Sequence, residues 1–119
     1  MKVEIAEKLL RALISGKYGA AKNQLRTNMG YCCLGVLCDL YHAETGKGQW
    51  RGRTVDKAWW VFEVGSSSDG NYLPPAVQEW AGVVHKNPMG LGATNDEDGW
   101  PAVIQFLRGY IAAKRDDNI

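Results

Sequence analysis

The chain has 119 residues, a formal net charge of +1 and three cysteines. Hydrophobic residues make up 45% and charged residues 23%, which is ordinary globular usage and excludes a disordered or fibrous protein. A charge so close to zero provides no general attraction to nucleic acid or membrane surfaces, so any electrostatic role is local. We expect one domain over residues 1–119, with a charged, frayed tail at 114–119.

The compartment predicted from the sequence is the cytoplasm. No apolar run approaches the ~20 residues of a membrane span, and the first ten residues, MKVEIAEKLL, lack the apolar core of a secretory signal. An odd number of cysteines, two of them adjacent, is a poor disulfide framework and fits a reducing environment.

The first half of the chain predicts two helices. Residues 3–14 carry apolar side chains at helical spacing, and a polar, glycine-punctuated loop follows over 17–30. A second helix is predicted from about residue 30 to 43, with apolar groups around nearly its whole circumference. Its narrow polar or small strip is Gly35, Asp39 and His42, where Gly35 lets another backbone come close. This helix is therefore expected at the centre of the core.

The second half predicts a hairpin and two more helices. Residues 57–64 alternate with period two and are rich in aromatic residues, which favours a strand, and SSSDGN at 66–71 is a turn signal with residues 71–74 as the return strand. Helices are predicted over 74–81 and from 100 to 113, an extended piece over 83–89, and an acidic turn over 95–99. The expected fold class is α+β: three to four helices around a Cys/Leu-rich central helix, with a small antiparallel sheet or hairpin.

The three cysteines invite metal or thiol chemistry. Cys32 and Cys33 are adjacent rather than spaced as zinc ligands, and Cys33 lies about 140° round the helix from Cys38. His42 shares a face with Cys38, but His85 would be only a third ligand. Cys32 is the best candidate nucleophile, because the helix N-terminus favours a thiolate there. Burial as small hydrophobic groups is the favoured interpretation, and we expect no metal and no cofactor.

The acidic segment Asn95 to Gly99 superficially resembles a calcium loop. An EF-hand loop ends in a bidentate glutamate, whereas position 107 is leucine. The favoured interpretation is the entry to the last helix, with Asp98 as its cap.

The most suggestive polar cluster is KGQWRGRTVDKAWW, at residues 47–60. Guanidinium groups pair with phosphate oxygens and indole rings stack on nucleobases, so this mixture suits a nucleotide-like ligand. The alternative is a strand edge with solvated charges and inward tryptophans; period two sends Trp59 and Trp60 to opposite faces. With the later Asn-Asp pair added, the expected ligand-binding residues are Trp50, Arg51, Arg53, Lys57, Trp59, Asn95 and Asp96.

Three segments, YCCLGVLCDLY, YLPPAVQEWAG and TNDEDGWPAVIQFL, resemble a family of small, mostly uncharacterised proteins of bacteriophage and prophage genomes. Thr94 and Pro101 depart from that pattern, where leucine and a Ser or Phe-type residue are commoner. The resemblance implies a virus-encoded protein acting in the host bacterial cytoplasm, a setting in which small phage proteins often counter host defence.

The leading hypothesis is a non-enzymatic counter-defence protein that sequesters a nucleotide-derived immune signal or binds a host defence protein. No Walker loop, G-x-G-x-x-G, G-x-S-x-G or H-E-x-x-H motif occurs, which disfavours an enzyme. One alternative is a small hydrolase or transferase that acts on a nucleotide-like ligand through Asp96 or Cys32. The other, disfavoured by the charge of +1, is a nucleic-acid-binding accessory protein. We also expect a homo-oligomer.

Overall fold

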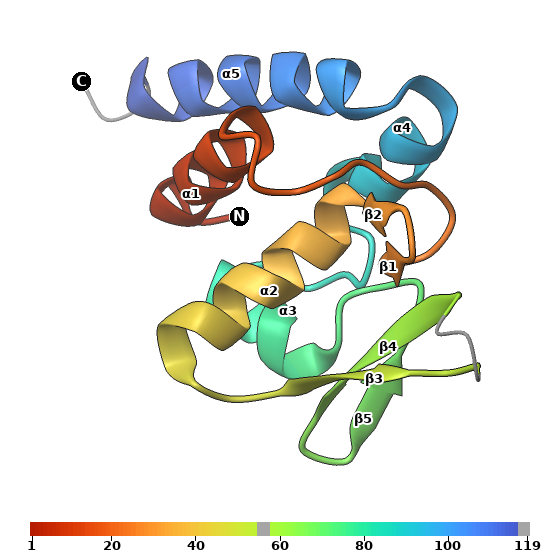
Figure 1. Ribbon diagram of the computed structural model, residues 1–119. Coiled ribbons are helices and arrows are strands. Elements are labelled where there is room, and N and C mark those ends of the chain that lie inside the picture. The colour runs from red at the N-terminus through yellow and green to blue at the C-terminus, as the bar shows by residue number, and fades with distance from the viewer. Residues whose placement is uncertain (55–57, 117–119) are drawn as a thin grey trace.

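The structure, a computed structural model, describes residues 1–54 and 58–116 (Figure 1). Its helices are α1 (Val3–Ile14), α2 (Cys33–Thr45), α3 (Pro75–Ala81), α4 (Leu91–Asp98), α5 (Trp100–Asp116) and a short 3-10 helix, η1 (Pro88–Gly90). Its strands are β1 (Arg26–Thr27), β2 (Gly30–Tyr31), β3 (Gln49–Gly52), β4 (Trp59–Val64) and β5 (Ser67–Asp69). The fold class is α+β, as the sequence predicts.

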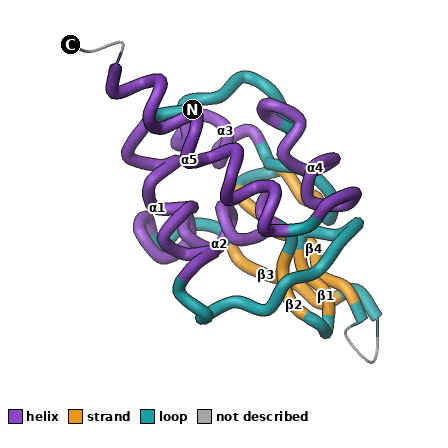
Figure 2. Tube along the Cα trace, turned by 90° about the horizontal axis from the view of Figure 1, so that it is seen from above, coloured by secondary structure: helices purple, strands orange, loops and turns teal. Residues whose placement is uncertain are grey.

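Helix α2 runs through the middle of the molecule. It contacts α1, α3, α4 and β2, while α5 lies across α1 and α4 (Figure 1). Seen from above, the strands gather at one end and α1 and α5 lie away from them (Figure 2). No helix of the described residues is long and apolar enough to cross a bilayer.

The predicted central helix is confirmed, with a shifted start. Every residue from 33 to 38 is buried, which accounts for apolar groups all round the helix. The helix begins at Cys33 rather than at Gly30, because Gly30 and Tyr31 pair with Thr27 and Arg26 as β2. Glycine at position 46, with φ of 72°, ends it in the left-handed conformation.

The sheet is antiparallel and is organised by β4. Trp60 pairs with Gly52 of β3 on one side and with Arg26 of β1 on the other. Further along β4, Phe62 pairs with Trp50 of β3 and with Asp69 of β5. Strands β1 and β5 therefore lie end to end along one edge of β4, and β3 occupies the opposite edge.

The predicted turn at 66–71 is wrong in position. Ser67–Asp69 forms β5, and the pairing of Val64 with Ser67 leaves Gly65 and Ser66 as a two-residue turn. Gly65 has φ of 60°, the left-handed conformation that such a turn needs. The return strand is thus polar, and residues 71–74 do not take that place.

Two other predictions in the second half are corrected. Residues 83–89 form no strand; Leu73 N–H donates to the Lys86 carbonyl at 2.9 Å, and Pro88 begins the 3-10 helix. The acidic segment 95–99 is not a turn, because its first four residues complete α4 and Gly99 caps that helix. Asp98 therefore ends α4 instead of capping α5.

The last helix extends beyond its predicted end. Lys114, Arg115 and Asp116 belong to α5. The two cations lie in its final turn, where they stabilise the helix by interacting with the negative end of its dipole. Residues 117–119 lie outside the described residues.

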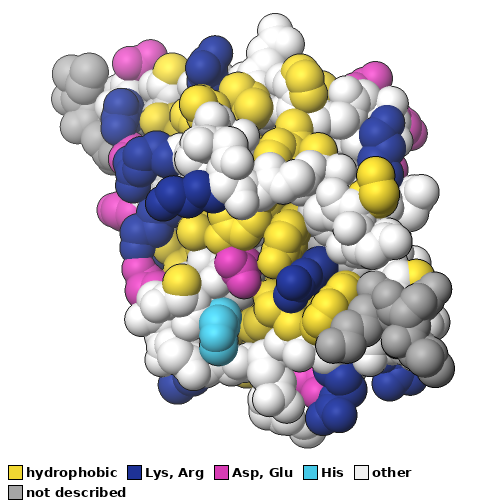
Figure 3. All heavy atoms as spheres, viewed as in Figure 1, with side chains coloured by type: hydrophobic (Ala, Val, Ile, Leu, Met, Phe, Trp, Pro, Cys, Tyr) yellow, Lys and Arg dark blue, Asp and Glu magenta, His cyan; other side chains and the backbone are white. Residues whose placement is uncertain are grey.

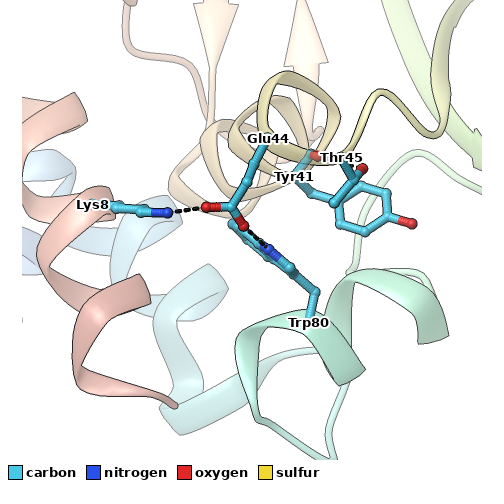
Figure 4. Close-up of polar contacts among 5 residues, drawn as sticks. All are labelled: Lys8, Tyr41, Glu44, Thr45 and Trp80. Carbon is cyan, nitrogen blue, oxygen red and sulfur yellow. Dashed lines mark hydrogen bonds and ion pairs between the residues drawn. The ribbon is translucent and has the colours of Figure 1, made fainter.

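A side-chain bridge joins three helices at their exposed edges (Figure 4). Glu44 of α2 pairs with Lys8 of α1 and accepts a hydrogen bond from the Trp80 indole of α3. The bond from Lys8, and then that from Trp80, holds the pKa of Glu44 below its usual range. The Trp80 ring packs edge-on against Tyr41 at a centroid distance of 5.7 Å, so the exposed bridge borders the core.

Among the described glycines, Gly35 has the closest backbone neighbour, and this approach generates a stability prediction. A Cβ added there would lie 1.8 Å from the Leu25 carbonyl oxygen, which cannot move aside as a flexible side chain would. Gly35→Ala should therefore lower the free energy of unfolding by about 3 kcal/mol, at the upper end of usual overpacking costs. Urea denaturation followed by circular dichroism measures it.

Gly109→Ala is the matched control, because Gly109 also lies within a helix but has nothing within 4 Å of an added Cβ. That change should raise stability by about 0.5–1 kcal/mol, through helix propensity alone. Equal effects of the two substitutions would contradict the close approach at Gly35.

Candidate functional site

The predicted tryptophan and arginine cluster is divided between two faces of the sheet. Paired residues of an antiparallel sheet point to the same side, so Trp50, Trp60 and the fully buried Phe62 share the helix-facing side. Arg51 and Trp59 point to the other side. The predicted opposition of Trp59 and Trp60 is confirmed, and Trp50 is separated from the arginines beside it in sequence.

The outward side carries three of the predicted ligand-binding residues. Arg51 Nε donates to Glu63 Oε1 at 2.6 Å, and this bond holds the pKa of the Glu63 carboxyl below its usual range. The Arg53 guanidinium lies 6.0 Å from the Trp59 ring centroid. The third predicted cation, Lys57, lies outside the described residues.

The helix-facing side presents an arginine among aromatic rings. The guanidinium carbon of Arg26 lies 4.2 Å from the Trp60 ring centroid, 5.1 Å from that of Tyr31 and 5.6 Å from that of Trp50. All four residues are partly exposed. We call Arg26, Tyr31, Trp50 and Trp60 the arginine-aromatic surface. Figure 3 shows basic and acidic side chains among hydrophobic ones in front of α2 and the strands.

Asp39 of α2 holds this surface in place through hydrogen bonds. Its carboxylate accepts hydrogen bonds from the Tyr18 hydroxyl at 2.6 Å and from Trp50 Nε1 at 3.1 Å. Burial, and then this bond to Asp39, raises the pKa of Tyr18, which remains a neutral donor. Tyr18 also packs edge-on against Tyr31. The polar strip of α2 thus supports a site formed by residues from other segments.

Arg26 is the functional candidate that sequence reasoning missed. It lies in a segment predicted as loop, 24 positions before Trp50, and the pairing of β1 with β4 brings it onto Trp60. The sequence around a two-residue strand carries no local pattern that predicts this pairing. The sequence signals near this site are Trp50, which is among the predicted ligand-binding residues, and Asp39 on the polar strip of α2, whose carboxylate accepts the Trp50 N–H.

The predicted residues Asn95 and Asp96 serve a different region. Asn95 is fully buried: its Oδ1 accepts from Cys33 N–H at 3.0 Å, and its Nδ2 donates to the Ala21 carbonyl at 2.9 Å. Asp96 Oδ1 accepts from Asn23 N–H at 2.8 Å. Among the described residues, neither side chain hydrogen-bonds to the arginine-aromatic surface.

Asp96 lines a small pocket of about 150 Å³. Its other lining residues are Asn23, Cys32, Asn71, Tyr72, Asn87, Gly92 and Ala93, and we call this hollow the asparagine-lined pocket. The segments 31–41, 72–82 and 94–107 each contribute to it, through Cys32, Tyr72 and Asp96. Cys32 and Asp96, the two residues of the enzyme alternative, are therefore brought together.

The cysteines are buried and carry their protons. Burial raises the pKa of the Cys32 thiol to about 11, against an ordinary value of 9.0, and also raises the pKa values of Cys33 and Cys38 well above 9.0. Cys33 Sγ donates to the Leu91 carbonyl. In the part of the chain that the structure describes, no three His, Cys, Asp or Glu residues are grouped to hold a metal ion.

The fold and these two sites define a small α+β protein with an arginine-aromatic surface and a separate polar pocket. The chain belongs to the family described as Domain of unknown function (DUF8296), whose match covers residues 1–100. That match includes every residue of both sites. Comparison with curated proteins and with solved structures gave no match.

The raised thiol pKa values predict slow reaction of all three cysteines with Ellman's reagent at pH 8, because the attacking species is the thiolate. Three thiols should react promptly after unfolding in guanidinium. Since the folded state holds these protons more tightly, the free energy of unfolding should also fall as the pH rises from about 9 toward 11.

The Cys32→Ser variant shows whether a reactive thiol of the folded protein is Cys32. Rapid labelling of one cysteine in the native protein, absent from the Cys32→Ser variant, would contradict a buried neutral thiol and support the nucleophile hypothesis.

Proposed function

We propose that this is a non-enzymatic binding protein that holds a small nucleotide-like ligand on the arginine-aromatic surface. The observation that supports the proposal is the set of contacts that Arg26 makes. Its guanidinium is held among three aromatic rings, and among the described residues no carboxylate pairs with it. A cation placed in this way is a ready partner for a ligand anion.

The chemistry of the surface fits a phosphate joined to a flat base. A guanidinium packed on a ring keeps its N–H groups at its edge, where two phosphate oxygens can accept them together. Exposed parts of the indole and phenol rings provide stacking surface for a nucleobase. The hydrogen bonds of Tyr18 and Trp50 to Asp39 hold the site in place, which reduces the entropy lost on binding.

The groups gathered here are suited to binding rather than to reaction. Asp39 accepts a hydrogen bond at each carboxylate oxygen, from Tyr18 and from Trp50, so its contacts position the binding residues. Tyr18 holds its proton tightly, because its pKa is raised. These features favour sequestration of an intact ligand.

An enzyme is the second candidate, supported by the meeting of Cys32 and Asp96 in the asparagine-lined pocket. A thiol nucleophile must lose its proton near neutral pH, whereas burial raises the pKa of Cys32 to about 11. Binding is therefore the better-supported function of the two.

The resemblance to bacteriophage and prophage proteins supports a biological setting for the ligand. In that setting the protein is virus-encoded, acts in the host bacterial cytoplasm and sequesters a nucleotide-derived immune signal. A host defence protein is the other proposed partner, because arginine, tyrosine and tryptophan are the residues that dominate protein interfaces. A homo-oligomer, with the surface repeated in each subunit, remains part of this proposal.

The test combines mass spectrometry of small molecules released from the purified protein with calorimetric titration of cyclic nucleotides and ADP-ribose. Arg26→Ala should weaken binding by about tenfold or more, through loss of a charge-assisted contact. Arg26→Lys should recover part of it, since it restores the charge but not the planar fork. Ligand recovered intact after binding excludes turnover.

Arg108→Ala is the matched control, because it removes the same charge from an exposed position of α5. Arg53→Ala reports on the outward side of the sheet. Binding that depends on Arg53 and not on Arg26 would contradict the proposed surface, and a wild-type protein that binds no nucleotide would refute the sequestering function.

A further inference from the structure

We infer that the asparagine-lined pocket binds an organic cation with several N–H donors, such as a guanidinium or ammonium group. The inference goes beyond the proposed function, because it concerns a different site and a ligand of opposite charge. It depends on the free hydrogen-bonding atoms, the charge and the size of the pocket.

The free atoms of the pocket follow from the contacts of its side chains. Asn71 Nδ2 donates to the Asn23 carbonyl at 2.8 Å, so the amide orientation is fixed and Asn71 Oδ1 is left as an acceptor. Asp96 Oδ1 is occupied by Asn23 N–H, which leaves Oδ2 as a second acceptor. Among the described residues neither oxygen has a protein donor. A ligand that fills the site therefore needs at least two donors.

The charge of the pocket favours a positive ligand. Asp96 is the only carboxylate in the lining and has no cationic partner among the described residues. The other side chains of the lining are uncharged, since the raised pKa keeps Cys32 a neutral thiol at pH 7. An unpaired carboxylate in a partly enclosed site attracts a cation more strongly than one in open water.

One positive group lies near the rim, where its charge opposes the attraction of Asp96 for a cationic ligand. Lys86 Nζ lies 4.7 Å from the ring centroid of Tyr72, a lining residue whose side chain is partly exposed. Asn87 Oδ1 accepts from Gly92 N–H at 2.7 Å, which fixes the amide orientation and leaves Nδ2 as a donor for an oxygen of the ligand.

The size of the pocket decides against a nucleotide. Its volume of about 150 Å³ corresponds to about five water molecules at ~30 Å³ each, well below the ~300 Å³ at which pockets for drug-sized ligands begin. A guanidinium or ammonium group on a short carbon chain is of the right size. Such a group can belong to a free small molecule or to an arginine or lysine side chain of a peptide.

The test follows backbone and side-chain amide resonances by NMR while methylguanidinium or methylammonium is added to the folded protein. Saturable shifts are expected at Asn23, Asn71, Asn87 and Asp96. Methylurea, which has the shape of methylguanidinium without its charge, should bind at least about tenfold more weakly. Equal binding of methylurea would overturn the cation site, as would the absence of saturable shifts at these residues.

Asp96→Asn is the informative variant, because its amide oxygen still accepts from Asn23 N–H while the charge is lost. It should weaken methylguanidinium binding by about tenfold or more and leave nucleotide binding unchanged. Asp98→Asn removes the same charge two positions along α4, outside the lining, and should bind as wild type. Undiminished binding by Asp96→Asn would refute the inference.

Two further titrations identify the source of the cation. Agmatine represents a free guanidinium compound, and a blocked Gly-Arg-Gly peptide represents a protein partner. Binding of either at the same four residues supports the inference and assigns the source, and binding of neither overturns it. Arg26→Ala should leave both titrations unchanged, which separates failure of this site from failure of the nucleotide surface.

Discussion

The structure depends on a close contact between the backbone of Leu25 and the first turn of α2. Gly35 leaves room for the Leu25 carbonyl, and that carbonyl also accepts from Cys32 N–H at 3.0 Å. Leu25 N–H donates to the Gly70 carbonyl at 2.7 Å, immediately after β5. Both backbone groups of this buried residue are therefore satisfied, and the central helix, the sheet and the connecting segment meet at one point.

The same segment supplies a residue to each site. Asn23, two positions before Leu25, lines the asparagine-lined pocket in a left-handed conformation with φ of 70°, which asparagine tolerates well. Arg26, one position after Leu25, enters β1 and packs on Trp60. Buried Asn95 fastens the other end of the segment through the Ala21 carbonyl. Its neighbour Asp96 is thereby directed to the pocket, so adjacent residues divide structural and ligand-facing roles.

Apolar periodicity predicts those elements of this fold whose apolar side chains are buried in the core. Helix α1 matches its predicted bounds, and α2 is central because its apolar groups surround the axis. The strands β1 and β5 could not be predicted in this way, since one has two residues and the other is the polar sequence Ser67–Asp69. Strand β5 follows β4 after a two-residue turn and lacks an apolar alternation, whereas β1 pairs with residues of β4 that are far away in the sequence. Arg26 was missed for that reason, while Trp50, which lies on β3 beside the predicted β4, was found.

The fixed backbone at Leu25 has a consequence for recognition. Flexible loops lose conformational entropy when they close on a ligand, and this loss reduces affinity. Here the residues on either side of Leu25 are already held, Arg26 by three rings and Asn23 by Asp96 and Asn71. Little ordering is left for a ligand to impose at either site. The fixed backbone of Leu25 therefore places Arg26 on the sheet and Asn23 at the pocket, so that one short segment supplies a residue to each of two separate sites.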